Sequence, residues 1–120
     1  MESSEQDFKA MMHLFKKRDY QWSLFVGHLV LEKLFKAYYV QRSSENPPFI
    51  HDLLRLAERG GMVVGEDQKD MLDTISGFNI STRYNDYEQS FRKKCTREFT
   101  RAWIANIKEL RTWIKRQLSG

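Results

Sequence analysis

The sequence is poor in the residues that break helices or cross-link chains. Its only two prolines, Pro47 and Pro48, are adjacent, and its only cysteine is Cys95. Proline ends helices, so the chain outside residues 47 and 48 is free to be helical over long stretches. A single cysteine cannot form an internal disulfide, and such sparse cysteine use suits a reducing compartment.

Long hydrophobic runs are also missing. Glu32, Lys33 and Lys36 interrupt the most apolar segment, so we expect no transmembrane helix. The opening residues, MESSEQDFK, are acidic and polar, the opposite of a secretion signal. We therefore expect a cytoplasmic protein without a membrane partner.

Motifs of known chemistry are scarce as well. No glycine-rich phosphate loop occurs, because RGGMVVGED at residues 59–67 lacks the lysine and the threonine of a P-loop. The three histidines (His13, His28 and His51) are far apart in sequence, and no second cysteine accompanies Cys95. We expect no metal, no cofactor and no catalytic residue of a standard type.

What the chain does contain is apolar residues at helical spacing. They predict an all-α, up-and-down bundle of about five helices in a single domain, residues 1–120. The expected helices cover residues 3–18, 19–42, 51–59, 66–76 and 87–118. The segment 19–42 carries few polar positions, so it should be the central, most buried helix.

Basic residues gather near the end of the chain. Residues 88–118 include nine Lys and Arg residues but only three Glu residues. On a helical wheel, Lys93, Arg97, Arg101 and three later cations share one stripe. Such a stripe could bind a phosphate backbone, or it could simply be the solvated face of an amphipathic helix.

The central helix carries one polar line, formed by Gln21, His28 and Glu32, with Lys36 one turn beyond Glu32. Such a line faces solvent or fills an internal groove. The Glu32–Lys36 spacing favours a structural i, i+4 ion pair over a catalytic one.

Three stretches, in this order, resemble the HEPN domain family of small helical proteins. They are HLVLEKLFKAYYV at residues 28–40, PPFIHDLLRLAERGG at 47–61 and FNISTRYNDY at 78–87. The resemblance implies that the Arg-Tyr loop folds back onto the bundle, with Phe78 and Ile80 anchored in the core. Arg83 would then make a fixed polar contact or present its guanidinium to an anion.

Members of the family's nuclease branch resemble one another in a motif, an arginine followed four to six residues later by a histidine. This sequence lacks that motif. The resemblance therefore favours a non-catalytic nucleotide- or RNA-binding module, forming a homodimer and accessory to a small nucleotidyltransferase. The alternative is a toxin-like HEPN endoribonuclease with a non-standard pair such as His51 and Arg83. For nucleotide or phosphate binding we expect six residues: Arg83, Tyr84, Lys93, Arg97, Lys36 and His51.

Overall fold

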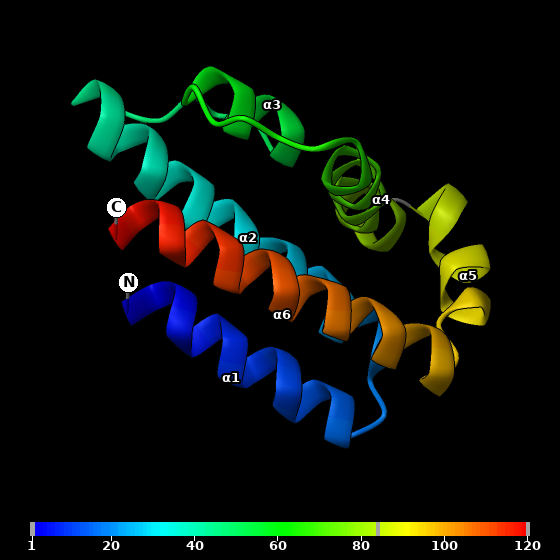
Figure 1. Cartoon of the computed structure of the whole chain (residues 1–120). Helices are drawn as coiled ribbons and strands as arrows, with labels where there is room; N and C mark the ends of the chain where they lie inside the picture. The colour runs from blue at the N-terminus through cyan, green and yellow to red at the C-terminus, as the bar shows by residue number, and fades with distance from the viewer. Residues whose placement is uncertain (1, 84, 120) are drawn as a thin grey trace.

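The computed structural model describes residues 2–83 and 85–119, and these residues form six helices and no strand (Figure 1). The helices are α1 (Glu2–Lys16), α2 (Tyr20–Ser43), α3 (Leu53–Arg59), α4 (Glu66–Arg83), α5 (Asn85–Lys94) and α6 (Arg97–Ser119). The predicted all-α bundle is confirmed. There are six helices instead of about five because the expected last helix is divided into α5 and α6.

Three long helices, α1, α2 and α6, lie side by side (Figure 1). The α1 helix runs antiparallel to α2, and the Ser23 hydroxyl donates to the carbonyl of Met11 at 2.8 Å across their contact. The α6 helix runs parallel to α2, so that the Gln41 amide near the end of α2 reaches the carbonyl of Leu118 near the end of α6. Both chain ends therefore lie at the same end of the bundle.

The α2 helix is the central element, as predicted, because it contacts all five other helices. At Gly27 it packs tightly against two of these neighbours. A Cβ at this position would lie 2.6 Å from Cδ1 of Ile107 on α6 and 3.0 Å from Sδ of Met11 on α1. Glycine at position 27 is thus what allows three backbones to pack together.

The helix predicted to end at residue 76 continues to Arg83, and the next helix begins at Asn85, so the non-helical connection expected between residues 76 and 87 is wrong. Leu72, Ile75, Phe78, Asn79 and Thr82 are buried and share one face of α4. Burial of that face outweighs the intrinsic cost of a helical glycine, which is about 1 kcal/mol.

The expected anchoring of this stretch is half confirmed. Phe78 is only 4% exposed, and its ring stacks on Phe91 at 5.3 Å and meets Trp103 edge-on at 5.6 Å. Ile80 is 52% exposed, so its predicted role as a core anchor is wrong. Two positions along a helix turn a side chain by about 200°, which places residue 80 opposite residue 78.

The final helix begins at Arg97, ten residues later than residue 87, where the sequence predicted its start. The hydroxyl of Thr96 accepts a hydrogen bond from the amide of Phe99 at 3.1 Å, which is the geometry of an N-cap. The break at Cys95 and Thr96 turns α5 away from the axis of α6 (Figure 1).

Cys95, at that break, is buried. Burial raises the pKa of its thiol to about 11, so the sulfur stays protonated at neutral pH.

Among the described residues, no helix is both long enough and apolar enough to span a membrane.

Candidate functional site

The polar line of α2 meets the segment before α3 in a compact cluster. Oε1 of Glu32 accepts a hydrogen bond from Nδ1 of His51 at 2.8 Å, and Oε2 accepts one from Nζ of Lys36 at 3.1 Å. One turn earlier, Nε2 of His28 donates to the backbone carbonyl of His51 at 2.8 Å. The predicted Glu32–Lys36 ion pair is present and belongs to a four-residue network.

The electrostatics of this network fix its protonation. Burial alone would raise the pKa of Glu32, but the hydrogen bonds from His51 and Lys36 outweigh it and hold that pKa below its ordinary value. Burial lowers the pKa of His28, which is fully enclosed and therefore neutral. Because Glu32 is ionised, Nδ1 of His51 carries the proton in the neutral ring, and Nε2 is left as the acceptor. The His51 side chain is 56% exposed.

The six predicted site residues do not form one site. Lys36 and His51 both bind Glu32, in the cluster between α2 and the segment before α3. Lys93 and Arg97 are exposed at the junction of α5 and α6. Arg83 is the last residue of α4, but its side chain and all of Tyr84 lie outside the described part of the chain.

The predicted basic stripe is divided by the break before α6, and two of its later cations share one acidic partner. Glu5 on α1 pairs with Arg111 at 2.7 Å and with Lys115 at 2.8 Å. The Arg111 guanidinium also lies 4.0 Å from the centre of the Phe8 ring. These contacts hold α1 against α6.

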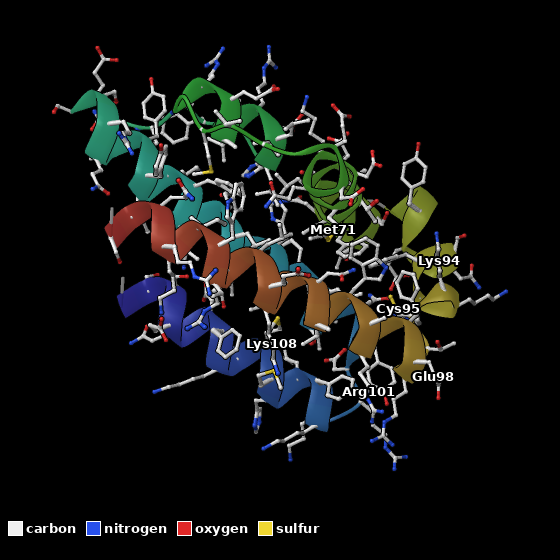
Figure 2. The ribbon with its side chains drawn as sticks, viewed as in Figure 1. Met71, Lys94, Cys95, Glu98, Arg101 and Lys108 are labelled. Atoms are coloured by element: carbon white, nitrogen blue, oxygen red, sulfur yellow. The ribbon has the colours of Figure 1, made fainter. Side chains whose placement is uncertain are left out.

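The end of α1, the end of α5 and the start of α6 lie at one end of the bundle (Figure 1), and each of them carries cationic residues. Within residues 2–83 and 85–119, these cations form no ion pair with an acidic side chain. We call this set the cationic end; Figure 2 labels two of its members, Lys94 and Arg101, with Lys108 farther along α6. Its members are Lys16, Lys17, Arg18, Lys93, Lys94, Arg97 and Arg101.

Reasoning from the sequence found the α5–α6 half of this surface and missed the α1 half. The run KKR at residues 16–18 is visible in the sequence, immediately before the polar turn into α2. What the sequence could not give is that this turn packs beside α5. Gln21 shows the contact directly, because its Nε2 donates to Glu88 on α5 at 3.1 Å.

Within the part of the chain that the structure describes, no group of three or more His, Cys, Asp or Glu side chains has the geometry to hold a metal ion. Arg97, Glu98, Arg101, Ala102 and Ala105 line a groove of about 490 Å³ on α6. An arginine pair beside small side chains can bind the phosphate groups of a ligand, since guanidinium forms paired hydrogen bonds with phosphate oxygens.

The arrangement of a central buried helix, a proline break and a His-Asp helix start agrees with a comparison against protein families. The chain matches the family model of the HEPN domain over residues 1–117. It belongs to the HEPN family, and this membership supports a role connected with nucleotides or RNA. No curated protein and no solved structure matches the chain.

Proposed function

We propose that this HEPN protein is a non-catalytic module that binds RNA or nucleotides through the phosphate groups, and that the cationic end is the binding surface. The observation that carries the proposal is the contrast between the two ends of the bundle. At one end Arg111 and Lys115 both form ion pairs with Glu5. At the other, Lys93, Arg97 and Arg101 have no acidic partner among the described residues. Unpaired cations supply the sequence-independent part of nucleic-acid affinity.

The test is RNA binding measured by fluorescence anisotropy across a range of salt concentrations. We expect the K93A/R97A/R101A variant to bind a single-stranded RNA more weakly. The slope of log K against log[salt] should be shallower by about 2 if all three cations contact phosphates. A matched control, K9A/R55A/R59A, removes the same charge from exposed positions on α1 and α3 and should retain most of the affinity. Equal losses in both variants would indicate only a general charge effect.

We also propose that the protein is a homodimer. Phe49 is 99% exposed, and Ala37, Val40 and Pro47 line an apolar groove of about 610 Å³ near it. A two-fold axis would let each copy insert Phe49 into the groove of the other. Light scattering should give twice the chain mass of 14.4 kDa, and Phe49→Ser should return the mass to that of one chain.

As the resemblance to accessory HEPN proteins suggests, the partner that we propose is a small nucleotidyltransferase. A gene for such an enzyme beside the gene for this chain would support the pairing. Co-expression should then yield a complex of both proteins that survives gel filtration, and separate elution would contradict it.

The second candidate function is RNA cleavage, and one observation favours it. The carboxylate of Glu32 orients His51, whose side chain is 56% exposed and whose Nε2 can accept a proton, as a general base does. If this candidate is correct, wild-type protein cleaves RNA, and His51→Ala abolishes the cleavage while the fold is retained. Absence of cleavage by wild-type protein, with binding intact, favours the non-catalytic module.

A further inference from the structure

The polar cluster between α2 and the segment before α3 lies next to an exposed aromatic side chain. Phe49 precedes His51 by two residues, and of the exposed large apolar side chains among the described residues it is the most exposed, at 99%. The amide of Ile50 donates to the carbonyl of Pro48 at 3.0 Å, so the chain turns at Phe49. A phenylalanine ring left in water is a large apolar area that a partner would bury.

The backbone that carries Phe49 is fixed by the polar cluster. The carbonyl of His51 accepts a hydrogen bond from Nε2 of His28, and Nδ1 of His51 donates to Oε1 of Glu32, both at 2.8 Å. His28 is fully enclosed on α2, so the first of these bonds ties the segment to the core. Phe49 is thus presented from a fixed position, which reduces the entropy lost when it binds.

A groove that can receive this ring lies beside the same cluster. Its volume is about 610 Å³, and Ala37, Val40 and Pro47 form its apolar part. Lys36 also lines it, and Nζ of Lys36 donates to Oε2 of Glu32 at 3.1 Å. Glu32 therefore holds the segment of the exposed ring with one carboxylate oxygen and a residue of the groove with the other.

A second copy of this chain is the partner that fits this surface. The exposed ring and the groove belong to the same protomer, so a two-fold axis brings each ring to the groove of the other copy. The charges are complementary as well. Glu45, four residues before Phe49, is exposed and forms no ion pair with another described residue. Lys36 uses one N–H on Glu32 of its own chain and has two left to donate to Glu45 of the partner subunit.

We propose that Glu32 is the positioning residue of a two-fold interface between copies of this chain. Through His51 it holds the segment that presents Phe49, and through Lys36 it holds the wall of the groove that receives Phe49 of the partner subunit. The inference rests on the proposed homodimer and deepens it, because it assigns the polar cluster to the interface.

His51 allows this positioning role to be separated from a catalytic one. The side-chain nitrogen of asparagine is the same number of bonds from the main chain as Nδ1 of histidine, and it is likewise a hydrogen-bond donor. His51→Asn therefore keeps the bond to Glu32 but has no ring nitrogen that can act as a general base. His51→Ala removes both.

The experiment measures the dissociation constant of the dimer by analytical ultracentrifugation over a concentration series, with the fold of each variant checked by circular dichroism. His51→Ala should weaken the dimer by about tenfold or more, because Phe49 loses its fixed position. Glu32→Gln, which loses one of its two acceptor oxygens, should weaken it similarly. His51→Asn should stay within about threefold of wild type.

Ile107→Val is the control for a loss of stability alone. It shortens a fully buried side chain on α6 that belongs neither to the segment of Phe49 nor to the groove. The variant should unfold more easily than wild type and should dimerise with an unchanged dissociation constant.

The inference is overturned if His51→Ala and Glu32→Gln dimerise as tightly as wild type, or if His51→Asn dimerises as weakly as His51→Ala. An equal weakening by Ile107→Val would also overturn it. The homodimer has a separate readout, because wild-type protein that sediments as one chain at every concentration would remove the interface together with the role of Glu32. A wild-type dimer that is lost in Phe49→Ser but unaffected by Glu32→Gln and His51→Ala would remove only the positioning role.

Discussion

The carboxylate of Glu32 joins α2 to the segment before α3, because its Oε1 accepts a hydrogen bond from Nδ1 of His51 at 2.8 Å. The two residues are 19 positions apart, on either side of the proline break. This bond, together with the one from His28 to the carbonyl of His51, fixes where the chain re-enters the bundle.

The first prediction concerns Glu32→Gln. It removes a nearly buried charge that holds two cationic or polar partners, and should lower the free energy of unfolding by about 1–3 kcal/mol. This loss of stability should be smaller than the loss caused by breaking a fully buried ion pair, because Lys36 and His51 are partly exposed and can be hydrated. Urea denaturation at pH 7 measures it.

Glu66→Gln on α4 is the control for this change. The Glu66 carboxylate is 88% exposed in its contact with Lys69, so its removal should leave the urea midpoint unchanged. Equal losses in the two variants would contradict the role assigned to Glu32.

The second prediction is a loss of stability in mild acid caused by His28. Burial lowers the pKa of His28 in the folded protein, whereas the unfolded chain binds the proton near the ordinary value of 6.5. The contribution of His28 is therefore complete above pH 6.5 and declines as the pH falls toward the folded pKa. The melting temperature of the wild type should fall between pH 7.5 and 5.5 more steeply than that of His28→Gln.

NMR provides the second measurement if His28→Gln does not fold. The ring of His28 in wild-type protein should remain neutral below pH 6.5. A normal titration of that ring would contradict the prediction.

The third prediction separates two glycines that both lie inside helices. A Cβ at Gly77 would meet nothing within 4 Å, so Gly77→Ala should raise the free energy of unfolding by about 0.5–1 kcal/mol. Gly27→Ala should lower it, because its Cβ would lie 2.6 Å from Cδ1 of Ile107. Thermal melts of the two variants should thus shift in opposite directions. Destabilisation by Gly77→Ala would indicate that the helix ends at Gly77 after all.

The fourth prediction compares Phe78 and Ile80. Phe78→Ala empties a site enclosed by the rings of Phe91 and Trp103 and should cost about 3–5 kcal/mol. Ile80→Ala, on the exposed side of α4, should change stability by less than about 0.5 kcal/mol. Chemical denaturation of both variants tests the assignment, and a large loss at Ile80 would show that another surface covers it.

The helices that the sequence predicted well are those with a local signal. The α2 helix and the break at Pro47 and Pro48 follow from apolar spacing and from the missing amide hydrogen of proline. The Glu32–Lys36 pair follows from i, i+4 geometry within one helix.

The features that could not be predicted depend on contacts between distant segments. Gly77 is a helix breaker by propensity, and only the burial of Ile75 and Phe78 against other helices carries α4 past it. The capping of α6 by Thr96 competes with a continuous helical pattern from residue 87 onward. Likewise, no spacing rule brings Arg18 beside Arg92, because the two meet only when the α1–α2 turn packs on α5.

The placement of the two chain ends has a practical consequence for experiments. Gln41 bonds the carbonyl of Leu118, and Lys115 bonds Glu5, so the first turns of α1 and the last turns of α6 lie together, away from the α5–α6 junction (Figure 1). A fluorophore, an affinity tag or a sensor-chip linker attached at either end would project from the far side of the bundle. If the protein is immobilised through either chain end, the cationic end points away from the support, and the attachment point does not obstruct RNA binding there.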